Sequence, residues 1–150
     1  MGIKKVILFG DTSFSGIIAE YINACDQARV VAFTVDALFI KGRSSFEGLP
    51  LISFETLEQH YNPGEYYIFI TTTVASRERN LNRKKLEEAR QKGYKAFSYV
   101  HPAAFVAHSV EIHENVFIFP HAVVEPRAKL NEGVILRSAA YVSHETEIGA

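Results

Sequence analysis

The sequence predicts two parts of different architecture, an α/β domain over residues 1–99 followed by a three-sided solenoid over residues 100–150. The first prediction comes from strand-like and helix-like segments that alternate through the first hundred residues. The second comes from a strict six-residue period that begins at Val100 and matches neither the roughly 3.6-residue period of a helix nor the roughly 2-residue period of a strand. The length of 150 residues, which alone indicates one ordinary domain, is therefore divided between two.

Short β-branched or aromatic runs that end at polar or glycine-containing turns are expected to be buried strands of a parallel sheet. These runs are Lys5–Phe9, Val30–Val35, Tyr66–Ile70 and Lys95–Val100. Helical segments are expected between them, at Phe14–Ala24, from the N-cap Ser53 to His60, and at Arg77–Lys92. This order of strands and helices is typical of a Rossmann-like α/β domain with a parallel sheet.

In the second part, every sixth residue is aliphatic without a miss. The nine positions are Val100, Val106, Ile112, Ile118, Val124, Leu130, Leu136, Val142 and Ile148. A small or β-branched residue follows four positions after each of the first eight: Ala104, Val110, Val116, Ala122, Ala128, Val134, Ala140 and Thr146. The spacing predicts that each six-residue unit forms one flat side of a coil, with the aliphatic side chain toward the axis, and that three units complete one turn.

Composition excludes several classes of protein. The 16 Lys and Arg residues balance 17 Asp and Glu residues, which gives no electrostatic basis for binding nucleic acid or an anionic membrane surface. The apolar runs are too short to span a bilayer, and the first residues lack a signal-peptide pattern. A single cysteine, Cys25, excludes an internal disulfide. We therefore expect a cytoplasmic protein with neither a nucleic-acid nor a membrane partner.

Candidate ligand-binding residues follow the expected strands. The turn Gly10–Gly16 offers backbone N–H groups and hydroxyls at a helix N-terminus, a geometry that suits a phosphate. Its candidate contacts are Gly10, Thr12, Ser13, Phe14 and Ser15. Asp36, Thr71 and Thr72 follow the next strands at the edge where open α/β sheets bind ligands. An ordinary turn, a loop aspartate and a polar strand end are the structural alternatives. The turn lacks the middle glycine of a dinucleotide fingerprint, so no nicotinamide cofactor is expected.

Five of the six histidines lie in the second part, which raises the possibility of a metal site. His108 and His144 are two coils apart, so they are expected to share one position of the repeat with Pro126 between them. Because coils stack at strand spacing of about 4.8 Å, their backbones would lie roughly 9–10 Å apart. Two ligands of one zinc ion each lie only about 2 Å from it. We therefore expect no metal site within one subunit; histidines contributed by three subunits around an axis are the alternative.

A Rossmann-like domain that runs directly into hexapeptide repeats resembles the sialic acid O-acetyltransferase / bacillosamine N-acetyltransferase-like family of sugar acyltransferases, over essentially the whole chain. The matching pieces are the Gly10–Gly16 turn, Asp36, the junction Val100-His101-Pro102 and the stretch Val142–Gly149. The resemblance implies a left-handed parallel β-helix for the second part and a homotrimer. It also implies transfer of an acetyl or other acyl group from acetyl-CoA, as co-substrate, to an amino or hydroxyl group of a sugar. The expected acceptor is a UDP-linked amino sugar, with its nucleotide held by the first domain.

The resemblance also implies roles for individual residues. In the family, a histidine followed by an acidic residue carries the catalytic base, which points to His144, with Glu145 or another nearby acid fixing the imidazole tautomer. A neutral imidazole suits the removal of a proton from an attacking amine or hydroxyl. Arg137 stands where the family often has asparagine, so its contact with the acceptor is expected to differ.

Two other functions remain open at this point. Family members continue for several more coils that complete the acyl-CoA groove, so we expect this chain to be a truncated form of a longer enzyme. The alternative function is then a nucleotide-sugar-binding or scaffold protein that lacks a complete acyl-CoA site. A nicotinamide-binding protein is a third interpretation, which the Gly10–Gly16 turn supports only weakly.

Overall fold

In a computed structural model, which describes residues 2–71 and 80–149, the chain divides into two compact units with a boundary between Ala96 and Phe97. The expected strand Lys95–Val100 is therefore two strands, β6 (Lys95–Ala96) in the first unit and β7 (Tyr99–Val100) in the second. The physical reason lies at Ser98, between them. Its hydroxyl accepts a hydrogen bond from the Val116 N–H at 3.0 Å and donates one to the His113 carbonyl at 3.1 Å, so the chain already belongs to the second unit there.

The first unit is built on a six-stranded sheet in the order β3-β4-β2-β1-β5-β6. Its further strands are β1 (Lys4–Phe9), β2 (Ala28–Val35), β3 (Ser45–Phe46), β4 (Leu49–Ser53) and β5 (Tyr66–Ile70). All neighbouring pairs are parallel except β3 and β4, which are antiparallel. Because β1 lies between β2 and β5 in parallel, the residues that follow these three strands meet at one edge of the sheet. Gly10, Asp36 and Thr71 occupy those positions.

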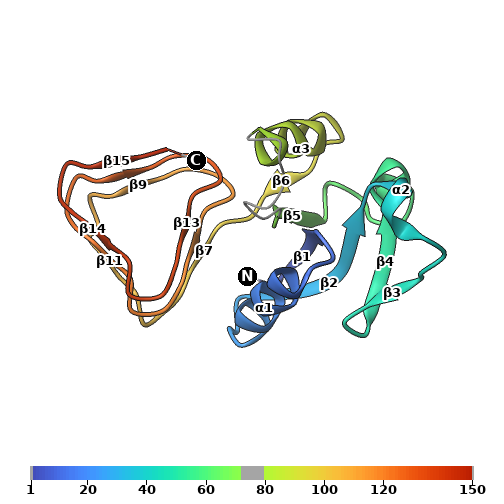
Figure 1. The fold of residues 1–150 in the computed structure, drawn as a ribbon, viewed down its shortest axis with the longest axis horizontal. Coiled ribbons are helices and arrows are strands. Elements are labelled where there is room, and N and C mark those ends of the chain that lie inside the picture. The colour runs from blue at the N-terminus through green and yellow to red at the C-terminus, as the bar shows by residue number, and fades with distance from the viewer. Residues whose placement is uncertain (1, 72–79, 150) are drawn as a thin grey trace. The chain divides into compact units, whose positions relative to one another are not determined.

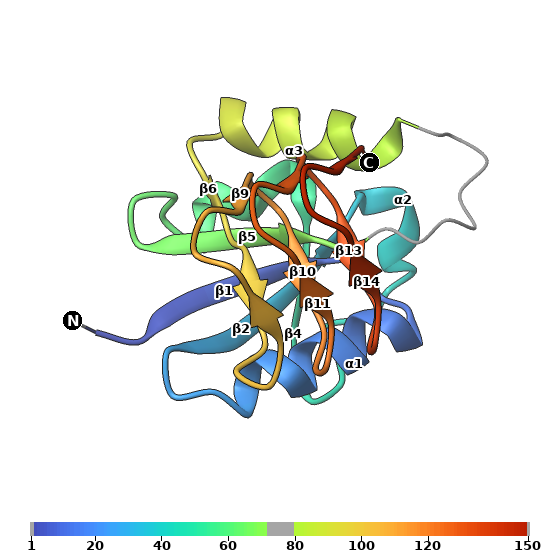
Figure 2. The ribbon, with the colours of Figure 1, turned by 90° about the vertical axis from the view of Figure 1, so that its left-hand side faces the viewer.

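Helices cover both faces of this sheet, α1 (Ser13–Asn23) on one and α3 (Leu81–Gln91) on the other (Figure 2). The remaining helical segments are α2 (Ala37–Ile40) and the 3₁₀ helix η1 (Phe54–Gln59). Leu86 and Ala89 of α3 join Phe54 and Leu57 of η1 in one buried cluster against the sheet. The expected helix at Arg77–Lys92 is thus present from Leu81, and its residues 77–79 lie outside the described part of the chain. The Rossmann-like class of this unit stays a prediction.

The second unit consists of two-residue strands that form three parallel sheets, one for each side of a three-sided coil (Figure 1). After β7 these strands are β8 (Phe105–Val106), β9 (Glu111–Ile112), β10 (Phe117–Ile118), β11 (Val123–Val124), β12 (Lys129–Leu130), β13 (Ile135–Leu136), β14 (Tyr141–Val142) and β15 (Glu147–Ile148). Phe117 pairs with Tyr99 in one neighbouring strand and with Ile135 in the other, 18 residues away in each direction. The predicted repeat of three six-residue units is confirmed. The left-handed sense of the coil stays a prediction.

The aliphatic positions of the repeat form the axial core. Ile118, Val124 and Leu130 are fully buried, and the small residues Ala122 and Ala128 are buried beside them. Val100 is 40% exposed although it continues the same period, because β7 is the outer strand of its sheet and has a neighbouring coil on one side only. The period therefore predicts the direction of a side chain, and its place in the stack decides how deeply it is buried.

The corners of the coil carry a second six-residue period that the sequence analysis did not detect. From Asn115 onward, one residue per corner has a left-handed backbone, with φ between 56° and 78°: Asn115, His121, Arg127, Gly133, Ala139 and Glu145. Residues 18 apart in this set stack on each other. Asparagine and glycine adopt this conformation readily, whereas alanine, arginine and glutamate do so at a cost of about 1 kcal/mol. The mixed residue types explain why the pattern is hard to find in the sequence.

Candidate active site

His144 lies at a corner of the second unit, directly after β14 and Ser143. Its side chain is 62% exposed. Glu125, which follows β11 on the preceding coil, accepts a hydrogen bond from the His144 backbone N–H at 2.8 Å, and the same carboxylate oxygen lies 3.1 Å from His144 Nδ1. Ser143 Oγ lies 3.4 Å from that oxygen. The corner thus presents an accessible imidazole that is held at one nitrogen.

Glu145, the expected acidic partner of His144, is directed elsewhere. It occupies the left-handed corner position with φ 56°, and its carboxylate forms an ion pair with Arg127 at 2.9 Å. The acid that contacts the imidazole is Glu125. The signal for it was available in the sequence, since the 18-residue repeat places Glu125 beside Ser143 and therefore next to His144. The prediction named Glu145 or another nearby acid as the partner of His144, and the acid in contact with the imidazole is Glu125.

The carboxyl group of Glu125 has a strongly lowered pKa. Hydrogen bonds from the His144 backbone, the His144 ring and the Tyr141 hydroxyl lower the pKa of Glu125 from 4.5 to about 2. The same contact raises the pKa of Tyr141, because its hydroxyl donates to the carboxylate. Since the pKa of Glu125 is depressed in the folded state, these hydrogen bonds stabilise the fold above about pH 4.5, and their contribution is lost as the pH falls toward about 2.

We expect the Glu125 side-chain carboxyl to titrate near pH 2 when followed by ¹³C NMR. In a His144→Ala variant the midpoint should rise only part of the way to 4.5, because the backbone N–H of residue 144, the largest cause of the shift, remains. Glu147, whose pKa is lowered mainly by its hydrogen bond from Asn131, is the control and should titrate as before. A Glu125 midpoint that is identical in both proteins would contradict the contact with the ring.

Arg137 directly follows β13, and its guanidinium lies 5.0 Å from the centre of the Phe119 ring on the preceding coil. His101 occupies the equivalent position one coil before Phe119 and two coils before Arg137. A guanidinium above an aromatic ring is an oriented cation. The Phe119 ring therefore helps to fix the direction of the Arg137 guanidinium.

The Gly10–Gly16 turn of the first unit is held by hydrogen bonds through Thr71, the residue that follows β5. Ser15 Oγ lies 2.6 Å from Thr71 Oγ1, and Thr71 donates to the Phe9 carbonyl at 2.7 Å. Both hydroxyl-bearing residues are buried, so the structure gives them a role in joining the turn to β5. Gly10 is required there, because its φ is 134° and a Cβ would lie 2.3 Å from Thr71 Oγ1.

Other candidate residues of this turn are more accessible. Thr12 and Ser13 are exposed at the start of α1, and Phe14 is half-buried. Asp11, beside them, forms an ion pair with Arg43 at 2.6 Å. Exposed hydroxyls and N–H groups at a helix N-terminus can bind an anion. Thr72 lies outside the described residues.

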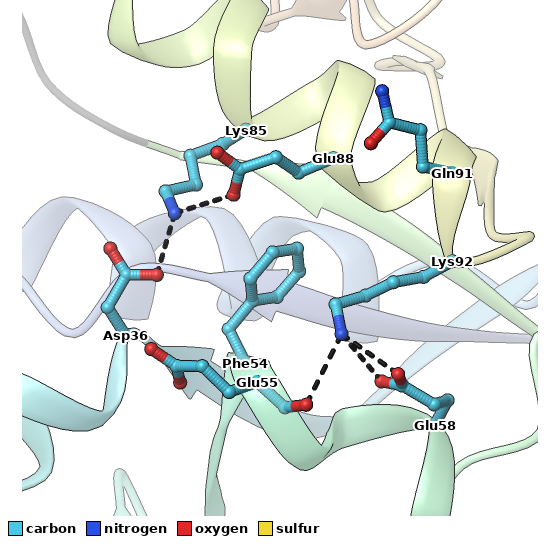
Figure 3. Close-up of a pocket in the computed structure, with 8 residues that line it drawn as sticks. All are labelled: Asp36, Phe54, Glu55, Glu58, Lys85, Glu88, Gln91 and Lys92. Carbon is cyan, nitrogen blue, oxygen red and sulfur yellow. Dashed lines mark hydrogen bonds and ion pairs between the residues drawn. The ribbon is translucent and has the colours of Figure 1, made fainter.

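Asp36, at the end of β2, lines an open pocket of about 470 Å³ between η1 and α3 (Figure 3). The other lining residues are Phe54, Glu55, Glu58, Lys85, Glu88, Gln91 and Lys92. Lys85 Nζ lies 2.7 Å from Asp36 and 2.8 Å from Glu88, and Lys92 Nζ lies 2.8 Å from Glu58. Four carboxylates against two ammonium groups make the pocket acidic. Such a pocket favours hydroxyl and N–H donors, and disfavours phosphates.

Lys85 is a further charged residue of this pocket. Its side chain is 10% exposed and also lies over the rings of Phe9 and Phe54. Burial lowers the pKa of Lys85, but hydrogen bonds and charge attraction from Asp36 and Glu88 outweigh burial and raise it above its ordinary value. Lys85 therefore stays charged and fixes the direction of the Asp36 carboxylate.

Two other features are absent from the described residues, 2–71 and 80–149. No group of three or more His, Cys, Asp or Glu side chains in this part of the chain is arranged to hold a metal ion. No helix of the same part has the length and apolar character to cross a membrane.

Comparison with known proteins places this architecture among sugar acetyltransferases. The chain matches no protein-family model. It resembles the acetyltransferase domain of PglB from Neisseria gonorrhoeae, with 27% sequence identity and a TM-score of 0.78, over 96% of this chain and 67% of that one. A structure of the same domain in complex with acetyl coenzyme A matches with 26% identity and a TM-score of 0.78, over 97% of this chain and 67% of that one.

A second resemblance is to perosamine N-acetyltransferase from Caulobacter crescentus. A variant of that enzyme with one histidine replaced by asparagine, in complex with CoA and GDP-perosamine, matches with 21% identity and a TM-score of 0.81, over 99% of this chain and 67% of that one. At this identity the likeness shows the fold alone. The likeness to the PglB domain supports an enzyme of the CoA-dependent sugar acetyltransferase kind, as expected from the sequence. The sialic acid O-acetyltransferase-like subfamily stays a prediction.

Proposed function

We propose that the protein transfers an acetyl group from acetyl-CoA to the amino group of a nucleotide-linked sugar, with His144 as the general base. The observation that carries the proposal is the exposed, hydrogen-bonded imidazole of His144 on a coil whose fold is that of sugar N-acetyltransferases. As the acceptor nitrogen attacks the thioester carbonyl, the imidazole removes a proton from that nitrogen, and the CoA thiol leaves. The chemistry needs no covalent intermediate on the protein.

The acceptor's nucleotide is assigned to the first unit. In this proposal the exposed hydroxyls of Thr12 and Ser13 and the start of α1 bind phosphate, while the acidic pocket at Asp36 binds hydroxyl or N–H donors of the nucleoside. A UDP-linked amino sugar and a homotrimeric assembly, both implied by the family resemblance, are parts of the same proposal. The perosamine enzyme binds a GDP-linked sugar. The experiment must therefore decide between uracil and guanine as the nucleobase of the acceptor.

The test is an acetyl-transfer assay with acetyl-CoA and matched UDP- and GDP-linked amino sugars, followed through the release of CoA thiol and the mass of the sugar product. We expect CoA release only with sugars that carry a free amine, because the base must remove a proton from an attacking nitrogen. Sugars with a hydroxyl in place of the amine are the control. If calorimetry shows that nucleotide sugars bind, but none of them leads to CoA release from acetyl-CoA, the protein is a nucleotide-sugar-binding protein and the proposed enzyme is rejected.

A further inference from the structure

Glu125 is a residue to which the sequence patterns and the family resemblance assign no role. Its carboxylate meets a cluster of hydrogen-bond donors from one segment of the next coil. Those donors are the backbone N–H of His144 at 2.8 Å, His144 Nδ1 at 3.1 Å, Ser143 Oγ at 3.4 Å and the Tyr141 hydroxyl. The pairing of β11 with β14 makes this possible, because it brings residue 125 beside residue 143. One carboxylate thus fixes the segment that carries the proposed base.

We infer that Glu125 is a positioning residue that holds the neutral His144 ring as its Nδ1–H tautomer, with the lone pair on Nε2. An ionised carboxylate can only accept hydrogen bonds, so the hydrogen between Glu125 and His144 must belong to Nδ1. A neutral imidazole has one N–H, so its other nitrogen is the basic one. The catalytic role of this hydrogen bond rests on the proposed function. The hydrogen bond itself rests on the distance between Glu125 and His144 Nδ1.

The surrounding groups keep Glu125 ionised and in place. The hydrogen bonds it accepts hold the pKa of Glu125 near 2, so its carboxylate is charged throughout the physiological range. A carboxylate next to the ring also stabilises the imidazolium that forms when His144 takes a proton. Arg127, which follows Glu125 by two residues, forms an ion pair with Glu145 at 2.9 Å. Glu145 therefore neutralises Arg127 and leaves the imidazole to Glu125.

The tautomer of His144 tests the inference independently of enzyme activity. ¹⁵N-labelled histidine gives separate NMR signals for the protonated and unprotonated ring nitrogens, and a His144→Gln variant assigns them. At alkaline pH we expect the Nδ1–H form in the native protein and in Glu125→Gln, whose amide oxygen still accepts. Glu125→Ala should abolish the preference for it, and Glu147→Ala, which alters an acid three residues away along the same coil, should retain it. An Nε2–H ring in the native protein, or an unchanged spectrum in Glu125→Ala, would overturn the inference.

Kinetics then separate a positioning role from a structural one. Glu125→Ala should lower kcat for acetyl transfer by about 10–100-fold, the usual effect of removing a partner that orients a functional histidine, with the KM for acetyl-CoA unchanged. Glu147→Ala should leave both constants unchanged. If the native protein shows the Nδ1–H tautomer but transfers no acetyl group, the proposed function fails and the inference on Glu125 stands. If Glu145→Gln alters the tautomer and Glu125→Ala does not, Glu145 is the positioning acid instead.

Discussion

Replacement of His144 by alanine should reduce acetyl-CoA-dependent transfer by ~10²–10⁴-fold, the usual contribution of a general base. The acceptor amine must lose a proton as its nitrogen bonds to the thioester carbon, and His144 is the imidazole of this corner that a neighbouring carboxylate orients. The loss should be in kcat, because the proposed contacts with the nucleotide lie in the first unit. Since the His144 side chain is 62% exposed, its removal opens no cavity in the axial core.

The measurement is steady-state CoA release, together with calorimetric binding of the nucleotide sugar. His108→Ala is the matched control, because His108 is an exposed histidine at the same position of the repeat, two coils earlier. We expect the control to transfer acetyl groups at the native rate and both variants to bind the sugar as the native protein does. Native turnover by His144→Ala would remove this residue from the mechanism. An equal decrease in kcat in the two variants would indicate a general effect of replacing histidines at the corners of the coil.

The geometry of the coil could be predicted in detail because one physical requirement repeats at a fixed interval. An aliphatic side chain must point to the axis once on each side, so Ile118, Val124 and Leu130 reveal the six-residue unit and the 18-residue register together. The first unit has no such repetition. There, the strand at Tyr66–Ile70 was predicted with its observed bounds, whereas the strand beginning at Lys95 was predicted too long, because the boundary between units has no hydrophobic signature.

Prediction of the site was less complete, for a different reason. His144 could be selected as a candidate because the motif that contains it is continuous in the sequence. Its partner Glu125 is 19 residues away, and the two meet only because one coil contains 18 residues. Lys85 and Asp36 are further apart still, and their ion pair depends on where α3 lies on the sheet. Ser15 and Thr71 were predicted as ligand contacts, and the structure buries their hydroxyls against each other.

Replacement of Ile118 by alanine should destabilise the second unit by about 2–5 kcal/mol, the range for large-to-small changes in a packed core. Ile118 is fully buried in the axial cluster, and its strand lies between β7 and β13, so neighbouring coils on both sides lose contacts. The amide exchange of Phe117 and Phe119 provides a local measurement, because their N–H groups bond to the Val134 and Leu136 carbonyls of the next coil. Both amides should exchange faster by the factor that corresponds to the loss in free energy of unfolding.

Val100→Ala is the matched control, since Val100 occupies the same column of the repeat one coil earlier and is 40% exposed. It should cost no more than about 1 kcal/mol, as expected for a site near the surface. The two positions are indistinguishable in the six-residue period, so any difference between them measures the effect of burial between two coils rather than one. Equal losses at both positions would mean that the outer coil is buried as deeply as the middle one, which would contradict the exposure of Val100.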